Sequence, residues 1–199
     1  MTTPNKITLT RILMIPVFVA MALYYGHGVK SGRPQEWQRV AAILVFMLAA
    51  ASDGLDGYIA RHYNQRSRLG LILDPIADKG LLLAGVITLT FSNWHYEFPL
   101  WFPILVISRD VVVVSGALLL HHINGKVTVR PSLVGKAATA LQMLSIAVAM
   151  LLVNRPGLSP EAPFPWMDVL VITAGIFTAV SGIGYVIDGI HQLQSGDHA

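Results

Sequence analysis

The amino-acid sequence predicts an all-α, polytopic membrane protein with six transmembrane helices and both termini in the cytoplasm. Three observations predict this fold class: hydrophobic residues make up 54% of the 199 residues, charged residues make up only 13%, and the apolar residues gather in six long segments. A soluble globular domain carries roughly twice this charged fraction. The composition therefore excludes a soluble enzyme and a disordered chain. The absence of cysteine excludes a disulfide-rich domain, a thiolate nucleophile and a zinc–thiolate or iron–sulfur site.

A transmembrane helix needs about 20 residues, and the length of each of the first three apolar segments meets this requirement. They are Ile7–Tyr25, Val40–Tyr58 and Gly70–Phe91, separated by a polar stretch over residues 26–39 and an arginine-rich stretch over residues 59–69. The first segment resembles a secretory signal peptide, because Lys6 precedes an apolar run that contains small residues near its end. The further spans that follow it favour a retained transmembrane helix.

The last three segments meet the same length requirement. They are Pro99–Leu120, Leu133–Val153 and Trp166–Ile187, and the connections around them are short and polar or rich in Gly and Pro. None of these connections is long enough to hold a folded soluble domain. We therefore expect a single domain over residues 1–199.

The distribution of basic residues predicts the orientation in the membrane. The side of the membrane that holds both termini carries Lys6, Arg11, Arg61, Arg66, Arg68, Lys126, Arg130 and Lys136. The opposite side carries only Lys30, Arg33, Arg39 and Arg155. Because cytoplasmic loops are enriched in Lys and Arg, the termini are predicted to be cytoplasmic. The opposite ends of the spans carry Trp37, Trp94, Trp101 and Trp166, which is typical of an interfacial aromatic belt.

Four aspartates lie near the predicted cytoplasmic ends of the second and third segments. A carboxylate inside a membrane span costs about 2.5–3.5 kcal/mol on insertion scales, so such residues are usually functional. One helix face holds Asp53, Asp56, Gly57 and Ala60, and another holds Gly70, Asp74 and Asp78. A short connection makes the two helices antiparallel neighbours. Two carboxylate pairs are therefore predicted to face each other across small residues.

Carboxylates this close to one another repel, so the predicted site needs a cation. Arg61, Arg66 and Arg68 are near in sequence but belong to a loop. A divalent metal is the better candidate, because ligands that are all oxygen, without cysteine or converging histidines, favour Mg²⁺ or Mn²⁺ over Zn²⁺. Four carboxylates are enough to bind two such ions, as in phosphoryl-transfer sites.

Each aspartate also has a purely structural interpretation. Asp74 before Pro75 is typical of a helix N-cap followed by proline at the first helical position. Asp53-Gly54 and Asp56-Gly57 are typical of turns at a helix end. Asp78, however, lies roughly 12 Å along the third segment, where no cap or turn is needed. The aspartates taken together therefore favour a functional site.

The aspartates belong to a longer pattern that resembles the signature of a known family. The pattern is Asp53-Gly54-Leu55-Asp56-Gly57-Tyr58-Ile59-Ala60-Arg61, then eight residues, then Gly70, Asp74 and Asp78 at four-residue intervals, or D-x2-D-G-x2-A-R-x8-G-x3-D-x3-D. All eight fixed positions match the signature of the CDP-alcohol phosphatidyltransferases at the family spacing. The chain also resembles this family in its length and its six spans. Asn5-x2-Thr8-x2-Arg11 resembles a second, shorter element of the same family.

The resemblance implies an enzyme that transfers a phosphatidyl group from CDP-diacylglycerol, or another CDP-alcohol, to an acceptor hydroxyl and releases CMP. Asp53, Asp56 and Asp74 match positions that hold two metal ions. Asp78 lies close to these ions as a further ligand and matches the position of the general base. The residues that the resemblance places around the CDP group are Asn5, Thr8, Gly57, Ala60, Arg61 and Gly70. Members of this family are commonly homodimers.

Basic residues later in the chain predict the acceptor site. Arg109 lies about twelve residues from the cytoplasmic end of its span, roughly 18 Å deep, and either binds an anionic acceptor or pairs with an aspartate. Asp110 is not expected to be that partner, because adjacent residues do not face each other on a helix. Arg130, Ser132 and Lys136 surround the start of the fifth segment and can bind a phosphate, although contact with solvent or lipid headgroups is equally open for Arg130. A deep basic site favours glycerol 3-phosphate as acceptor.

Two sets of residues resemble different members of the family. The stretches 5–12 and 73–79 resemble the members that form phosphatidylglycerophosphate from glycerol 3-phosphate. The stretch 107–111, with Ser132 and Lys136, resembles the members that form cardiolipin with phosphatidylglycerol as acceptor. Glycerol 3-phosphate is the leading prediction and phosphatidylglycerol is the alternative.

A cation or solute transporter is an alternative from a different functional class, with the aspartates as an ion pathway. A transporter site lies near the membrane midplane and is often built from internal repeats, whereas this sequence has no repeat and its aspartates lie on one side. We therefore expect an enzyme in the bacterial inner membrane whose active site faces the cytoplasm. Its expected partners are CDP-diacylglycerol, the acceptor alcohol, the lipid bilayer and a second copy of the chain, and no nucleic acid.

Overall fold

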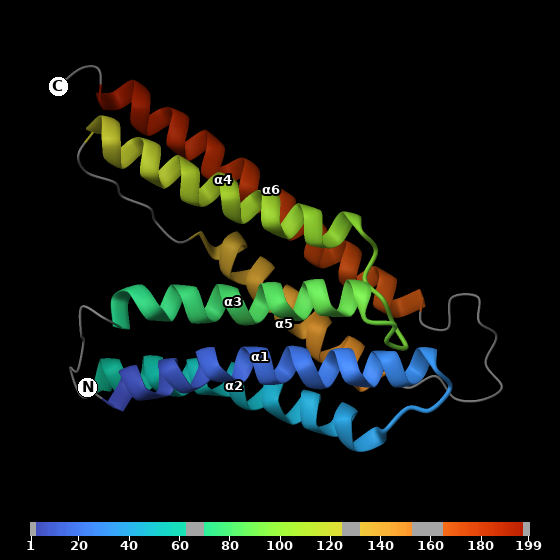
Figure 1. The fold of residues 1–199 in the computed structure, drawn as a ribbon. Helices are drawn as coiled ribbons and strands as arrows, with labels where there is room; N and C mark the ends of the chain where they lie inside the picture. Colours follow the sequence, from blue (N-terminus) through green and yellow to red (C-terminus); the bar gives the residue numbers. More distant parts are fainter. Residues whose placement is uncertain (1–2, 63–69, 125–131, 153–164, 197–199) are drawn as a thin grey trace. The chain divides into compact units, whose positions relative to one another are not determined.

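The computed structural model describes residues 3–62, 70–124, 132–152 and 165–196, and within these ranges it describes the side chains except at 3–5, 53–62, 70–72, 120–121, 123–124 and 192–196. The helices in these ranges are α1 Thr3–Lys30, α2 Glu36–His62, α3 Gly70–Phe91, α4 Trp101–Asn124, α5 Leu133–Leu151 and α6 Pro165–Gly196 (Figure 1). Each segment predicted to cross the membrane corresponds to one of these helices, with ends that differ by up to nine residues. The prediction of an all-α fold is therefore confirmed for the described part of the chain.

Four of these helices are long and apolar enough to cross a membrane. In the described residues the qualifying stretches are Lys6–Lys30 in α1, Trp101–Leu119 in α4, Leu133–Leu151 in α5 and Pro165–His191 in α6. Such helices are characteristic of an integral membrane protein. The other two helices, α2 and α3, carry the four aspartates of the predicted site.

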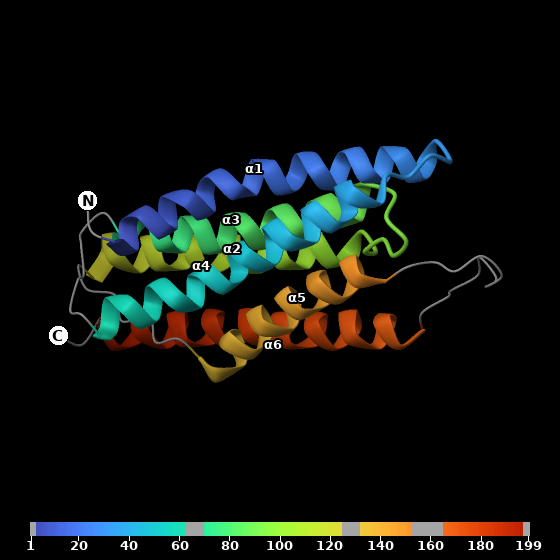
Figure 2. The same cartoon turned by 90° about the horizontal axis from the view of Figure 1, so that it is seen from below.

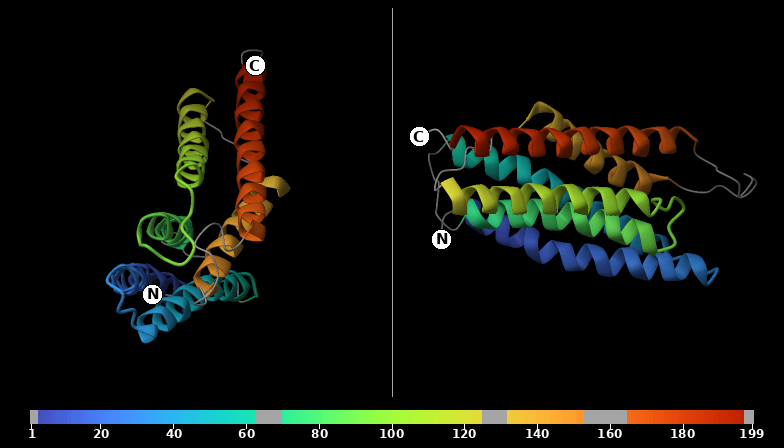
Figure 3. Two further views of the ribbon diagram at one scale, coloured as in Figure 1. Left: turned by 90° about the vertical axis from the view of Figure 1, so that its right-hand side faces the viewer. Right: turned by 90° about the horizontal axis from the view of Figure 1, so that it is seen from above.

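The helices belong to two compact units, and the boundary between the units falls within α5. The first unit comprises Met1–Phe98 and Ile146–Glu161, and the second comprises Pro99–Ser145 and Ala162–Ala199. In the first unit, α1 packs against both α2 and α3, and α2 runs antiparallel to them (Figures 1 and 2). In the second unit, α4 packs against α6, and the two helices run in the same direction (Figure 3).

Aromatic side chains pack α1 against its neighbours in the first unit. Phe18 of α1 contacts Phe46 of α2, with ring centroids 5.4 Å apart. Nearer the end of α1, Tyr25 packs edge-on against Trp94 at 4.9 Å. Trp94 donates from Nε1 to the backbone oxygen of Ala22 at 3.1 Å and is only 4% exposed. For Trp94 the expectation of a place in the interfacial belt is therefore wrong, because its indole N–H bonds to the protein interior.

The backbone of α1 also meets the segment that follows α3. A Cβ atom at Gly26 would lie 1.4 Å from the carbonyl oxygen of Ser92, so only glycine fits at this position. The next residue, Asn93, has a φ of 54°, in the left-handed region that asparagine tolerates better than most residues. This close approach fixes the end of α1 against the end of α3.

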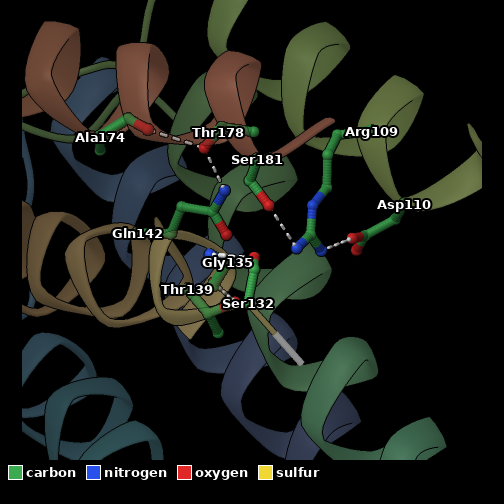
Figure 4. Close-up of polar contacts among 9 residues, drawn as sticks. All are labelled: Arg109, Asp110, Ser132, Gly135, Thr139, Gln142, Ala174, Thr178 and Ser181. Atoms are coloured by element: carbon green, nitrogen blue, oxygen red, sulfur yellow. Dashed lines mark hydrogen bonds and ion pairs between the residues drawn. The ribbon is translucent and has the colours of Figure 1, made fainter. Parts of the chain in front are cut away.

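Small and polar residues connect the helices of the second unit. A Cβ atom at Gly175 of α6 would lie 2.6 Å from the Trp101 ring of α4. Gln142 of α5 donates from Nε2 to the hydroxyl of Thr178 on α6 at 2.7 Å, and this hydroxyl donates to the Ala174 carbonyl at 2.7 Å (Figure 4). Both side chains are buried. Hydrogen bonds of this kind hold apolar helices together in a fixed register.

Candidate functional site

Both helices that carry the aspartate motif are continuous through it. α2 extends to His62, so Asp53 and Asp56 do not lie in turns at a helix end. α3 begins at Gly70 and has Pro75 in its interior, so Asp74 is not an N-cap. The structural interpretations of these aspartates are therefore wrong, because the helices run past the positions that caps and turns would occupy.

The described aspartates of the motif are engaged by other parts of the first unit. Thr8 of α1 donates from Oγ1 to Oδ1 of Asp74 at 2.7 Å, and the Thr8 side chain is fully buried. Asp74 itself is partly exposed, and so is Asp78 one turn later on α3. Asp78 also takes part in a polar interaction. Both carboxylates are therefore accessible from outside, and Asp74 is also held by a contact inside the unit.

Arg11 is a residue of this region that the sequence analysis did not assign to the site. Its side chain is fully buried, and its Nε donates to the hydroxyl of Ser52 at 3.2 Å. The Ser52 hydroxyl donates in turn to the Ala49 carbonyl at 2.7 Å. Ser52 directly precedes Asp53, so α1 places a permanent positive charge beside the first aspartate helix. A buried guanidinium needs compensating charge. The feature of the sequence that pointed to Arg11 was its three-residue spacing from Thr8.

The remaining residues predicted for the donor and metal site lie outside the described side chains. They are Asn5, Asp53, Asp56, Gly57, Ala60, Arg61 and Gly70, whose backbone positions fall on α1, α2 and α3. Among the side chains that the structure describes, no group of three or more His, Cys, Asp or Glu residues lies close enough to hold a metal ion. Two of the four aspartates predicted to bind metal ions, Asp53 and Asp56, have side chains outside the described part of the chain.

The second unit contains a buried guanidinium at Arg109. Its Nη1 donates to Oδ1 of Asp110 at 2.7 Å, and its Nη2 donates to the hydroxyl of Ser181 on α6 at 3.0 Å (Figure 4). The expectation that Arg109 and Asp110 do not pair is therefore wrong. Adjacent Cβ atoms on a helix do point apart, but the long arginine side chain turns its planar head back to the neighbouring carboxylate.

Further contacts enclose the Arg109 side chain, which is only 10% exposed. The ring of Tyr185 on α6 lies 5.3 Å from the guanidinium carbon, within the range of a cation–π interaction. A Cβ atom at Gly135 of α5 would lie 3.1 Å from Nη2. Among the described residues, Arg109 Nε is buried without a hydrogen-bond partner. The guanidinium thus keeps an unused donor although its head group is tightly held.

The first turn of α5 lies next to this guanidinium. Ser132 caps the helix, because its hydroxyl accepts from the Gly135 N–H at 3.0 Å and its carbonyl accepts from the Lys136 N–H at 3.1 Å. The Lys136 side chain is exposed. A helix N-terminus beside an arginine is a favourable place for an anion. Of the predicted acceptor residues, the structure therefore brings Arg109 and Ser132 to the start of α5, and Arg130 lies outside the described residues.

Ser181, Tyr185 and Gly135 also belong to this region and were not predicted. Ser181 and Tyr185 are four residues apart and so share one face of α6, where an apolar span carries few other polar side chains. That spacing was the available signal. Gly135 had no signal in the sequence, because its importance depends on what packs against it.

The chain matches a protein-family model over most of its length. The CDP-alcohol phosphatidyltransferase model matches residues 1–183, so the chain belongs to the CDP-alcohol phosphatidyltransferase family and is an enzyme of that family. The chain is 34% identical over 206 residues to a CDP-diacylglycerol–glycerol-3-phosphate 3-phosphatidyltransferase of Bacillus subtilis strain 168, covering 98% of each chain. It is 32% identical over 146 residues to a protein of the same name from Escherichia coli K12, covering 72% of this chain and 74% of that one. The resemblance predicted from the motif is confirmed.

Proposed function

We propose that this enzyme transfers the phosphatidyl group of CDP-diacylglycerol to a hydroxyl of glycerol 3-phosphate and releases CMP. The names of the two relatives support this donor and this acceptor. The observation in the structure that carries the proposal is the buried guanidinium of Arg109 beside the capped start of α5. A fixed cation of this kind suits an acceptor that bears a phosphate.

The proposed reaction is a substitution at the phosphorus that carries the diacylglycerol group. The acceptor oxygen forms a bond to this phosphorus, the bond between the phosphorus and the CMP oxygen breaks, and the CMP leaves with the electron pair. Asp78 takes the proton of the acceptor hydroxyl as general base. The transfer is direct in this proposal, because the hydroxyl of Ser52, the serine that adjoins Asp53, donates to the Ala49 carbonyl and accepts from Arg11 Nε, so it is not placed as an alternative nucleophile.

Two Mg²⁺ or Mn²⁺ ions are the cofactors in this proposal. Asp53, Asp56, Asp74 and Asp78 are the residues that would hold them, because an all-oxygen ligand set fits these hard cations. The fit is supported by the continuity of α2 and α3 through the motif, which keeps the carboxylates on helix faces instead of in caps. When bound, the ions supply positive charge to the diphosphate and the departing CMP.

The donor is proposed to lie along the same two helices. Gly57, Ala60 and Gly70 leave room for the nucleotide to approach the backbone, and Arg61 adds a cationic donor. Asn5 acts on the donor from α1, and Thr8 of the same helix bonds to Asp74. The proposed acceptor site consists of Arg109, Arg130, Ser132 and Lys136.

We infer the membrane arrangement from the same set of residues. All six helices cross the membrane, and both termini face the cytoplasm. Residues 1–199 act as one catalytic domain. The family match supports this single domain, because it runs through both compact units. The excess of basic residues on the side of the termini supports this orientation. The relatives are bacterial, which supports the inner membrane as the location. A homodimer is the proposed assembly.

The test is CMP release by the purified protein from CDP-diacylglycerol, with glycerol 3-phosphate, phosphatidylglycerol, serine and inositol phosphate compared as acceptors. Release with glycerol 3-phosphate alone is expected. Release with phosphatidylglycerol instead would make the enzyme a cardiolipin synthase, the alternative that Ser108-Arg109-Asp110 favours. No release with any acceptor from folded protein would contradict the proposed reaction. Excess EDTA is expected to abolish release and added Mg²⁺ or Mn²⁺ to restore it, and activity that resists EDTA would contradict the metal site.

A further inference from the structure

The hydrogen bond between Thr8 and Asp74 joins two helices whose bonded residues are 66 positions apart in the sequence. We propose that Thr8 is a positioning residue that holds the Asp74 carboxylate for metal binding and has no direct contact with the CDP group. This inference rests on the proposed function, because it takes Asp74 as a metal ligand. It assigns to α1 a role in building the metal site.

The geometry of the bond suits a positioning role. At 2.7 Å from oxygen to oxygen, the hydroxyl makes a short hydrogen bond to a group that is charged when ionised. The bond uses Oδ1 of Asp74, and a carboxylate has a second oxygen that can bind a cation. Thr8 is fully buried and β-branched, so its side chain is restricted to few rotamers. The carboxylate is therefore held by a rigid partner.

The position of Asp74 on α3 explains why it needs such a partner. Pro75, the next residue, lies inside the helix and cannot make the backbone hydrogen bond that would normally reach four residues back. The helix is therefore weakened at the point where Asp74 projects from it. A bond from α1 supplies the support that the local backbone lacks.

The same bond argues against a direct contact between Thr8 and the donor. A threonine hydroxyl has one proton to donate, and in this structure that proton goes to Asp74. A phosphate oxygen of CDP-diacylglycerol needs a donor, so it competes with Asp74 for this proton. A bond from Thr8 to a phosphate oxygen of the donor would therefore cost the bond to Asp74, and the proposed effect of Thr8 on the donor passes through Asp74 and the ions that Asp74 would hold.

The experiment measures Mn²⁺ binding to the purified full-length protein by electron paramagnetic resonance of the free ion. Thr8→Val removes the hydroxyl and keeps the shape of the side chain, and the expected result is a 10- to 100-fold weaker affinity, roughly the range for residues that orient metal ligands. Thr8→Ser keeps the hydroxyl and is expected to restore most of the affinity. Thr10→Val is the matched control, because Thr10 lies two residues along α1 and its exposed hydroxyl donates to the Lys6 carbonyl of its own helix at 2.9 Å.

The outcomes separate this inference from the proposed function. Unchanged Mn²⁺ affinity in Thr8→Val, with a raised KM for CDP-diacylglycerol, would make Thr8 a direct donor contact and overturn the inference alone. Wild-type protein that binds no Mn²⁺ would overturn the proposed metal site together with it. If Thr8→Val does not fold, Thr8→Ala removes the same hydroxyl without adding an atom, and the same loss of affinity is expected. A loss that persists undiminished when Thr8→Val is combined with Asp74→Asn would also overturn the inference.

Discussion

The charged residues of the two units are arranged in different ways. In α2 and α3 the aspartates repeat every three or four residues along a single helix face. In the second unit one guanidinium, that of Arg109, is surrounded by residues from three helices: Asp110 on α4, Gly135 on α5, and Ser181 and Tyr185 on α6. The first arrangement is local in sequence, and the second is assembled by packing.

In the proposed function this difference corresponds to two chemical tasks. The reaction at the diphosphate is the same for every acceptor, and it needs metal ligands and a base at fixed spacing. Recognition of the acceptor requires one charge in one orientation, which contacts from several helices can provide. We therefore expect damage to the aspartate helices to stop turnover with every acceptor. Damage around Arg109 should instead change how well one acceptor is used.

The largest expected effect is that of Asp78→Asn. Loss of a general base lowers kcat by about 10²- to 10⁴-fold, and CDP-diacylglycerol binding is expected to persist because the side chain keeps its size. The measurement is CMP release together with donor binding. Asp188→Asn is the matched control, since Asp188 is an exposed aspartate of α6 outside the site, and it should leave both quantities unchanged. Lost donor binding would make Asp78 chiefly a metal ligand.

Arg109→Ala should have the next largest effect and should sharpen the contrast between the units. Hydrogen bonds to charged groups contribute about 1.5–3 kcal/mol, so kcat/KM for glycerol 3-phosphate is expected to fall about 10- to 100-fold. The KM for CDP-diacylglycerol should not change. Arg109→Lys keeps the charge for Asp110 and serves as the folded control, although its single ammonium cannot replace the planar head group. An equal loss of donor affinity would erase the distinction between the two regions.

A smaller effect on the same acceptor is expected from Gly135→Ala. The added Cβ would lie 3.0 Å from the Ser132 hydroxyl and 3.1 Å from both Arg109 Nη2 and the Ser181 hydroxyl. Displacement of these groups should raise the KM for glycerol 3-phosphate about threefold to tenfold, the size of one neutral hydrogen bond. The thermal stability should change little, because the helix preference of alanine offsets the cost of displacing these groups. Gly116→Ala on α4 meets no atom within 4 Å and should leave the KM as it is.

The smallest effect concerns His95, which lies between α3 and α4 and belongs to neither charged region. Burial lowers the pKa of His95 below its ordinary value of 6.5, and the nearby Arg39 lowers it further, while Glu36 opposes the shift. As the pH falls, the unfolded chain binds this proton at a higher pH than the folded chain does. The free energy of unfolding is therefore at its full value above about pH 6.5 and decreases as the pH falls toward the pKa of the folded state. His95→Gln should flatten this decline in the unfolding temperature. An unchanged pH dependence of the unfolding temperature in His95→Gln would show that protonation of His95 does not affect the stability.

The contrast between the units also explains what the sequence could and could not reveal. The helices of the described residues, the all-α fold and the aspartate motif depend on residues close together in the chain, and composition and spacing were enough to predict them. Arg109 was predicted as a candidate because it interrupts an apolar span. Its bond to Asp110 was missed because the rule for adjacent residues describes Cβ directions and does not account for the reach of an arginine. The bond of Ser181 to Arg109, the packing against Gly135 and the Thr8–Asp74 contact depend on helices that are distant in sequence, so no local pattern encodes these contacts.

The two contacts between α1 and the third helical segment have a consequence for the enzyme in bilayers of different thickness. Thr8 bonds to Asp74 near one end of α1, and Gly26 touches the Ser92 carbonyl near the other, roughly 27 Å away along a helix. A helix held at two such points cannot slide or tilt independently of its partner. When the hydrocarbon thickness changes, helices adapt by tilting, and in the proposed arrangement of six membrane-crossing helices α1 and α3 must tilt together. We therefore expect the Mn²⁺ affinity of the protein to stay constant across lipids of different acyl length, and a steady drift with acyl length would show that the two helices move apart.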